Sequence, residues 1–393
     1  MCSLNRRASH TQHTKPVKHR GYALKKLLSI ALLMASATAS ATSYDLQVLN
    51  SLSGTGDSHA YALNDSGQVV GQSYNSATGA QESVIWNNGT ATALGVDGIA
   101  RGINNSGTVV GETGAAKLTQ ADGYAYSWTA ADGISYLGTL GGTYSGAYDI
   151  NEAGVVTGIS YTPTENLLQL QGFIYDSGTM SSLGTVSNPN GYSRGHGIND
   201  SNEIVGRTSV DMFNNSEKHM TYWDGSQNLN QNPTNGTYST GQQINNSGTI
   251  VGNGRQAATG NTQYGMVWDS AGNLLNVFGD FTDGSKGSRA WSINDAGVIV
   301  GWAKDASNAK RAMISYDGIN MVDLNTVVDL TGTGFVSLDE AYDINANGQV
   351  VGIGTLSDGS QGAFMISAIP VPAAVWLFGS ALAGLGWMRR RKA

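Results

Sequence analysis

Several residue types that often build small or catalytic sites are rare in this chain. Its 393 residues include one cysteine and six prolines, and charged residues make up only 13%. The cysteine, Cys2, lies in the signal segment predicted below, so the mature region has no disulfide, no thiol nucleophile and no cysteine metal site. Glycine is abundant, at 53 residues, which is typical of many short strands joined by tight turns.

Basic charge is scarce outside the two ends of the chain. Residues 1–41 hold seven Lys and Arg and no acid, and residues 389–392 add four more basic side chains. The region between them has eleven Lys and Arg against all 29 Asp and Glu, a net charge of about −18. Such a region repels phosphates, so we expect no nucleic-acid partner.

Catalytic motifs are also absent from the sequence. Only His59, His196 and His219 remain after the predicted processing, and no two of them have the spacing of a zinc site. There is no Gly-x-Ser-x-Gly elbow in a strand–helix context and no Walker-type phosphate loop. A structural role is the simpler interpretation of the histidines, and a protein without enzymatic activity is the favoured prediction, with an enzyme as the alternative.

Two pairs of acids are the remaining candidates for chemistry. Asp280 with Asp283, and Asp339 with Glu340, could bind Ca²⁺ or act as the two carboxylates of a glycosidase. Neither pair matches a defined cation loop, so solvated loop charges are the simpler interpretation. We therefore predict no cofactor and no metal.

The first long apolar run lies near the N-terminus. Residues 24–41, LKKLLSIALLMASATASA, combine a basic flank, a short apolar stretch and a small-residue end at Ala39 and Ala41. This order predicts a secretory signal peptide over residues 1–41, cut by signal peptidase after Ala41. The alternative, a membrane anchor, is disfavoured because the run is too short to span a bilayer.

The second apolar run lies at the C-terminus. Residues 371–388 carry no charge and are followed by a basic tail, which predicts a membrane-spanning helix whose tail stays cytoplasmic. A simple anchor is one interpretation of residues 369–393. A sorting signal is the other, with its elements at Pro370, Val371, Pro372, Ala373, Ala374, Arg389, Arg390 and Arg391.

The order of these elements closely resembles the PEP-CTERM sorting signal of Gram-negative bacteria. The match covers about 25 residues and fits the Val-Pro-x-Pro-Ala-Ala variant, in which Val371 stands where the namesake form has Glu. The resemblance implies transient anchoring in the inner membrane and cleavage near the Pro motif by an exosortase-type enzyme. It also implies a final location at the cell surface or outside the cell.

Between the two ends, one phrase recurs seven times. INNSGTVVG at 103–111 returns as INNSGTIVG at 244–252, and the other copies vary around the same pattern. The asparagine of each copy marks one repeat unit, numbered 1 to 7 here. These residues are Asn64, Asn104, Asn151, Asn199, Asn245, Asn294 and Asn345. Their spacing of 40 to 51 residues predicts a repeat architecture.

Each unit can be divided into strands and turns. A short strand ends at the repeat asparagine, a tight turn follows, and a β-branched strand such as QVVG comes next. The turn position is Gly in six units and Asn202 in unit 4, so we expect positive φ there. The asparagine side chain is expected to hydrogen-bond the backbone two residues on. The two valines should point to opposite faces, which indicates an inner strand that is apolar on both sides.

Four strands in each of seven units predict an all-β fold, a seven-bladed β-propeller over residues 42–368. Unit 7 has no fourth strand of its own, and SYDLQVLN at 43–50 is an unassigned strand before unit 1. We therefore expect the N-terminal strand to close the last blade. An open β-solenoid is the alternative, and it would leave two exposed edges.

The repeat units resemble the HAF-repeat family of extracellular bacterial proteins over roughly residues 44–367. The shared features are the Ile-Asn-x-x-Gly-x-Val-Val-Gly phrase, a following apolar-aromatic strand and Leu-Gly. This chain departs from the family at the His-Ala-Phe piece, where it has YAY, GFI or AFM. The resemblance implies an extracellular repeat architecture and no defined activity.

Function is expected in the connections that do not repeat. Variable loops share one face of a four-stranded blade, and loops on a rigid scaffold are where binding usually occurs. Their aromatic residues could stack on sugar rings or simply anchor the loops; they are Tyr74, Tyr144, Tyr161, Tyr192, Phe213, Tyr238, Phe281 and Trp302.

These observations favour an exported, non-enzymatic cell-surface or matrix protein that binds exopolysaccharide or protein partners such as envelope proteins through its variable-loop face. A secreted lyase or glycosidase on the same scaffold is the alternative. A structural coat protein without a ligand is a third possibility.

Overall fold

The computed structural model describes residues 44–54, 56–114, 123–163, 169–185, 191–209, 218–225, 228–231, 238–256 and 260–369. The predicted signal segment with Ala39 and Ala41 lies outside these residues, as does the sorting segment from Pro370 to Arg391. No helix in the described part of the chain is long and apolar enough to cross a membrane.

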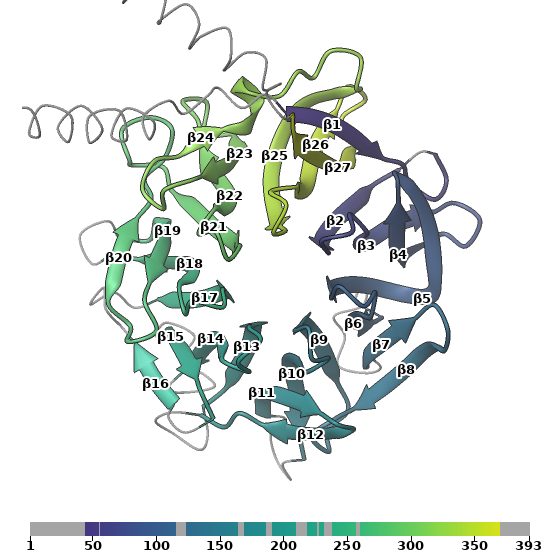
Figure 1. Ribbon diagram of the computed structural model, residues 1–393, viewed down its shortest axis with the longest axis vertical. Helices are drawn as coiled ribbons and strands as arrows, with labels where there is room; N and C mark the ends of the chain where they lie inside the picture. Colours follow the sequence, from purple (N-terminus) through teal and green to yellow (C-terminus); the bar gives the residue numbers. More distant parts are fainter. Residues whose placement is uncertain are drawn as a thin grey trace, which may run out of the picture. The chain divides into compact units, whose positions relative to one another are not determined.

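The described residues form an all-β fold, which confirms the predicted class. Apart from one turn of 3₁₀-helix at Leu324–Thr326, their regular elements are strands joined into antiparallel sheets. The sheets are arranged around a common centre, and the strand that ends just before each repeat asparagine lies innermost (Figure 1).

The first sheet along the chain has seven strands. In order these are β2 (Ser58–Leu63), β3 (Val69–Asn75), β4 (Ala80–Asn87), β5 (Thr90–Ile103), β6 (Val109–Thr113), β7 (Ala125–Thr129) and β8 (Gly133–Gly138). The long strand β5 serves two units, because its first half pairs with β4 and its second half pairs with β6.

The next three sheets have four strands each and correspond to units 3, 4 and 5. Unit 3 contains β9 (Ser145–Ile150), β10 (Val156–Thr162), β11 (Gln169–Asp176) and β12 (Thr179–Ser182). Unit 4 contains β13 (Ser193–Ile198), β14 (Ile204–Ser209), β15 (Lys218–Trp223) and β16 (Asn228–Gln231). Unit 5 contains β17 (Ser239–Ile244), β18 (Ile250–Arg255), β19 (Gln263–Trp268) and β20 (Leu274–Val277).

The last two sheets also have four strands. Unit 6 contains β21 (Ser288–Ile293), β22 (Ile299–Lys304), β23 (Lys310–Ser315) and β24 (Val322–Asp323). The final sheet has the order β1 (Tyr44–Leu49), β27 (Gln361–Ala368), β26 (Val350–Leu356) and β25 (Phe335–Ile344). The strand before unit 1 thus pairs with the last strand of unit 7, with Tyr44 opposite Ala368 and Leu49 opposite Ala363.

The hydrophobic core lies between neighbouring sheets. In unit 1, Val69 packs in a cluster with Val351 and Ala363 of unit 7, whereas Val70 packs in a cluster with Ile103 of unit 2. Both valines are fully buried. This confirms that consecutive valines of the β-branched strand point to opposite faces, and it makes each such strand a shared wall of two cores.

The turn after each repeat asparagine has the backbone that its residues predict. The turn glycines have φ between 74° and 83°, and Asn202, which replaces Gly in unit 4, has φ of 62°. The asparagine Oδ1 accepts a hydrogen bond from the backbone amide four residues on, for example from Thr108 to Asn104 at 3.0 Å. The partner expected from the sequence was the amide two residues on. Among the described turns, the asparagine Oδ1 also accepts a hydrogen bond from that amide in units 4 and 5 only, at 3.1 and 3.2 Å.

The other end of each asparagine side chain reaches the next unit. Its Nδ2 donates to the backbone carbonyl of the next repeat asparagine, at 3.0 to 3.2 Å in all seven units. The series includes Asn345 Nδ2 donating to Asn64 O, which joins unit 7 to unit 1. Each asparagine therefore fixes its own turn and its neighbour's position.

Candidate functional site

Every innermost strand carries a β-bulge at the same place. The strand pairing skips the third residue before the repeat asparagine in all seven units. A bulge redirects a side chain that a regular strand would commit to one face. The seven redirected residues, called the ring residues here, are Tyr61, Arg101, Tyr148, His196, Gln242, Trp291 and Tyr342.

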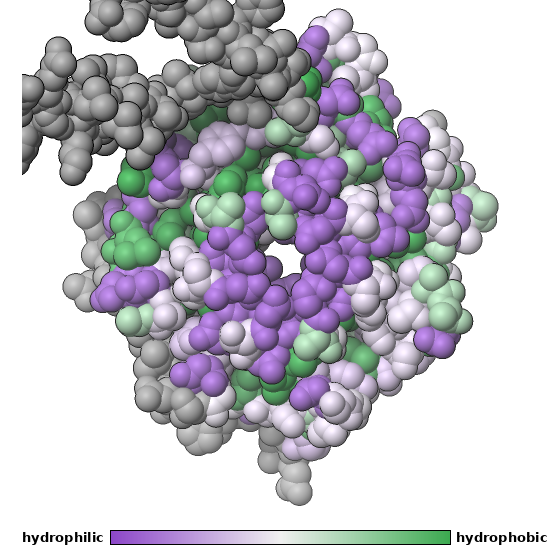
Figure 2. Space-filling view, in the orientation of Figure 1, coloured by the Kyte–Doolittle hydropathy of each residue, from purple (hydrophilic) through white to green (hydrophobic). Residues whose placement is uncertain are grey.

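The ring residues line one cavity of about 410 Å³. The residues that follow them in five of the units, Ala62, Asp149, Gln243, Ser292 and Asp343, complete its wall. In Figure 2, hydrophilic residues gather around the central opening of the face in view. A volume of this size suits a small polar ligand or one residue of a polymer.

Neighbouring ring residues touch one another around much of the cavity. The ring centroids of Trp291 and Tyr342 lie 5.6 Å apart, and those of Tyr342 and Tyr61 lie 5.3 Å apart. The Arg101 guanidinium lies 5.9 Å from the Tyr61 ring and 5.1 Å from the Tyr148 ring. These contacts hold aromatic and cationic groups in a fixed arc.

The cation in this arc is neutralised within the protein. Arg101 Nε donates to Glu112 Oε1 at 2.8 Å, and the hydroxyl of Tyr144 donates to the other oxygen of the same carboxylate. Arg101 is thereby held in place with its face against two tyrosines. Its role in the cavity is to present a rigid planar surface with hydrogen-bond donors at its edge.

Two carboxylates in the cavity wall also serve the scaffold. Asp149 accepts hydrogen bonds from the backbone amides of Ile150 and Ile198, each at 2.9 Å, and from Gln243 Nε2 at 3.1 Å. Burial raises the pKa of Asp149 to about 7, although these hydrogen bonds oppose the rise. The carboxylate links units 3, 4 and 5.

Asp343 has the corresponding role between units 6, 7 and 1. It accepts from the amides of Leu63 at 3.0 Å and Ile344 at 2.9 Å, and from the Ser292 hydroxyl at 2.6 Å. Burial raises its pKa as well, against the effect of the same hydrogen bonds. Both acids are at the residue directly after a ring residue.

The three histidines among the described residues, His59, His196 and His219, have different surroundings. His196 is a ring residue; its Nδ1 lies 2.9 Å from Gly241 O, and burial, with Arg207 nearby, lowers its pKa to about 3. His59 Nδ1 lies 3.1 Å from the Tyr61 hydroxyl, beside the ring. His219 is in β15, opposite Thr208. Of the three, only His196 lines the cavity.

The two residues of the first acidic pair, Asp280 and Asp283, accept hydrogen bonds from their own loop. Burial raises the pKa of Asp280, but hydrogen bonds from Thr282, Lys286 and Gly284 outweigh it and lower that pKa to about 2. Asp283 is exposed and accepts from Ser285. No group of His, Cys, Asp and Glu among the described residues has the geometry of a metal site.

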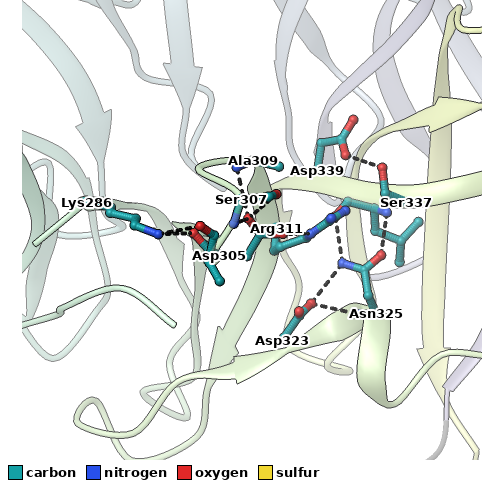
Figure 3. Close-up of polar contacts among 11 residues, drawn as sticks. Lys286, Asp305, Ser307, Ala309, Arg311, Asp323, Asn325, Ser337 and Asp339 are labelled. Carbon is teal, nitrogen blue, oxygen red and sulfur yellow. Dashed lines mark hydrogen bonds and ion pairs between the residues drawn. The ribbon is translucent and has the colours of Figure 1, made fainter. Parts of the chain in front are cut away.

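Asp339 and Glu340, the second pair, are in β25, and Asp339 lies beside Ser337 in Figure 3. Asp339 accepts from the hydroxyls of Ser337 and Thr355, each at 2.6 Å. Glu340 accepts from Trp291 Nε1 at 3.1 Å and is paired with Lys310. Asp339 is therefore a structural acceptor, and Glu340 positions a ring residue.

Nearby polar contacts tie the same region together. In Figure 3, Arg311 and Lys286 both point toward Asp305, and Asn325 lies between Asp323 and Ser337. Arg311 Nε donates to Asp305 Oδ2 at 2.8 Å, and Lys286 Nζ donates to the Asp305 carbonyl at 3.1 Å. These bonds order the connections of unit 6.

The aromatic residues predicted to serve binding have several environments. Tyr192 and Trp302 are buried, and Tyr144 contacts Tyr161, with ring centroids 5.7 Å apart. Phe281 packs against the core between units 5 and 6. Tyr74 covers Gly56. Tyr238 is surrounded by cations, as described below. Phe213 lies outside the described residues.

The sequence pattern alone did not single out the ring residues as a group, although the sequence contains a signal for them. Within the repeated opening phrase, the third residue before Asn changes from unit to unit but is always large and either aromatic or polar. Variation at one position of an otherwise regular phrase marks a place where the scaffold does not dictate the residue.

Comparisons with known proteins give distant matches. A family model described as "Protein of unknown function (DUF3466)" matches residues 213–314, about a quarter of the chain. A search of curated proteins found no match.

Two solved structures are similar to this chain at a low level. One is a mutant of Aleuria aurantia lectin in complex with alpha-methyl-L-fucoside, 10% identical, covering 70% of this chain and 95% of its own, with a TM-score of 0.36. The other is Trypanosoma rangeli sialidase in complex with the inhibitor DANA, 11% identical, covering 76% of this chain and 58% of its own, with a TM-score of 0.39. Similarity this distant identifies no ligand for this chain.

Proposed function

We propose that this protein is an exported, non-enzymatic carbohydrate-binding protein built on a closed seven-bladed β-propeller. Its ligand is an exopolysaccharide at the cell surface or in the extracellular matrix. The observation that carries the proposal is the ring of seven redirected side chains around a single cavity.

Closure is supported by contacts between the first and last units. β1 pairs with β27, Leu49 packs in one cluster with Val69 and Val351, and Asn345 donates to Asn64 O. An open solenoid would leave these groups at separate ends. Seven blades also account for the seven-stranded sheet, because β5 changes partners halfway along its length.

Carbohydrate suits the chemistry of the cavity. The half-buried rings of Trp291, Tyr342 and Tyr61 offer apolar faces for the C–H face of a sugar. Arg101, Gln242 and the tyrosine hydroxyls offer hydrogen bonds to sugar hydroxyls. Because the charges in the wall are already paired, a neutral sugar unit can bind without leaving a buried charge unpaired.

A glycosidase or lyase is the second candidate, because Asp149 and Asp343 line the same cavity and both have raised pKa values. The hydrogen bonds of these two carboxylates disfavour an enzymatic role. Each carboxylate accepts two backbone amides and a side-chain donor, so its oxygens are used to join units and are not directed at a ligand. Release of reducing ends or unsaturated products from a matrix polysaccharide would favour the enzyme.

The binding proposal predicts which variants lose affinity. The full chain should bind oligosaccharides from the producer's own exopolysaccharide in a glycan panel followed by calorimetry. Trp291→Ala and Tyr342→Ala should each weaken binding by about tenfold or more, because each removes a stacking surface.

The matched control is Tyr136→Ala, since Tyr136 is 60% exposed and lies on β8. This variant should bind as the unchanged chain does. Binding that is insensitive to Trp291→Ala and Tyr342→Ala would place the ligand elsewhere, and a panel without any bound glycan would refute the proposal.

The route to the cell surface is part of the proposal. The signal peptide, the exosortase-type sorting signal at Pro370–Pro372 and transient inner-membrane anchoring are supported by the sequence pattern alone. Mass spectrometry of protein recovered from the culture medium should find a chain that begins after Ala41 and ends near Pro372. An intact Arg389–Arg391 tail on the recovered protein would instead indicate a plain anchor.

A further inference from the structure

Four basic residues lie in the strands of units 4 and 5, toward the ends that are farther from the asparagine turns. Arg194 is the second residue of β13, Arg207 is near the end of β14, Lys218 begins β15, and Arg255 ends β18. We call them the basic cluster. They make up four of the eleven Lys and Arg between residues 42 and 388, a region of about −18 net charge.

Three of the four cations surround Tyr238, and the fourth, Arg194, lies 6.0 Å from the ring centroid of Tyr192. Arg207 Nη1 donates to the Tyr238 hydroxyl at 2.9 Å, and the Arg207 guanidinium lies 5.9 Å from the ring centroid. The Arg255 guanidinium lies 5.4 Å and Lys218 Nζ lies 5.7 Å from the same centroid. A backbone bridge between Lys218 and Tyr238 fixes the relative position of units 4 and 5 here.

The scaffold places like charges directly opposite one another. Arg194 and Arg207 are cross-strand partners in the β13–β14 ladder, an arrangement that is destabilising for two cations. Burial and the nearby Arg207, Arg194 and Arg255 lower the pKa of Lys218 to about 8. The cluster therefore concentrates positive charge at some cost to the fold.

No negative partner offsets this cost within the described part of the chain. The ion pairs found there involve Arg101, Lys310 and Arg311, none of which is in the cluster. The Nε atoms of Arg194, Arg207 and Arg255 are buried without any hydrogen-bond partner. The four residues as a whole are only half-buried, and a group of accessible cations without acidic partners is suited to an external anion.

We propose that the basic cluster binds the acidic group, carboxylate or sulfate, of an acidic polysaccharide. This deepens the proposed function and rests on it, because the same ligand reaches the cavity. Arg194 lies two residues before the ring residue His196 on the same strand, and Tyr238 adds a ring face beside the cations.

The test compares three oligosaccharide probes of matched length on the full chain. These are an oligogalacturonate for the carboxylate, a sulfated dextran oligomer for the sulfate, and a neutral dextran oligomer. At least one acidic probe should bind about tenfold or more tightly than the neutral one, with affinity that falls as salt rises. The stronger of the two acidic probes identifies the acidic group.

The double variant Arg194→Gln/Arg207→Gln should lose about tenfold or more in affinity for that probe. It should also be at least as stable to urea as the unchanged chain, because it removes two opposed like charges. A purely structural role for the arginines would lower stability instead. The control is Arg311→Gln, which changes a cation outside the cluster and should leave affinity unchanged.

Two results would overturn the inference and leave the binding proposal standing. One is equal binding of neutral and acidic probes that depends on Trp291. The other is tight acidic binding that the double variant does not weaken. If no probe and no panel glycan binds, both the inference and the proposed function fail.

Discussion

Among single residues, Asp149 is expected to make the stability of the fold depend on pH. Its pKa lies near 7 in the folded chain and at about 3.8 in an unfolded one. The folded state therefore holds a proton that the unfolded state has released over this range, so the free energy of unfolding should fall as pH rises from about 4 to about 7. The raised pKa of Asp343 acts in the same direction.

We expect the free energy of unfolding to fall by about 2 kcal/mol across this range. This is roughly half of what the full pKa difference would give, because Asp149 lines an open cavity where solvent screens its charge. Asp149→Asn should flatten the curve measured by urea unfolding at several pH values. Asp97→Asn, at an exposed carboxylate, should leave the curve as it is. A variant at Asp149 with an unchanged pH profile would show that the carboxylate stays ionised in the fold.

Among the elements, the turns and strands were predictable because each depends on neighbours in sequence. Positive φ at Asn202 follows from the residues that tolerate it, and the two-sided burial of Val69 and Val70 follows from the period of a strand. The partner of the repeat asparagine in the next unit was not predictable, since the sequence does not show how units stack.

The ring residues escaped prediction for a physical reason. A bulge adds one residue to a strand without changing its composition, so Tyr61 or Trp291 has the pattern of an ordinary strand position. The basic cluster escaped for a similar reason, because Arg207 and Arg255 are 48 positions apart and reach the same tyrosine, Tyr238, only when units 4 and 5 pack side by side. The prediction that function lies on the variable-loop face stays a prediction. The basic cluster gives it a definite location, in units 4 and 5.

At the scale of the whole molecule, the series of asparagine bonds distinguishes a closed ring from an open stack. Asn199 and Asn345 are matched: each donates to the next unit, at 3.2 Å and 3.0 Å, and each accepts the amide four residues on, at 3.0 Å and 2.9 Å. In a closed ring they occupy equivalent places. In an open stack, Asn345 would be at an end and its bond to Asn64 would be lost.

The closed ring therefore predicts equal costs for the two substitutions. Asn199→Ala and Asn345→Ala should each lower the free energy of unfolding by about 2 kcal/mol, because each removes buried hydrogen bonds and leaves backbone groups unpaired. Urea unfolding of the full chain provides the measurement, and Ser135→Ala, at an exposed position on β8, is the control. A cost of about 2 kcal/mol at Asn199 with only about 1 kcal/mol at Asn345 would indicate an open solenoid, since Asn345→Ala would then remove the bond within its own turn and no bond to unit 1.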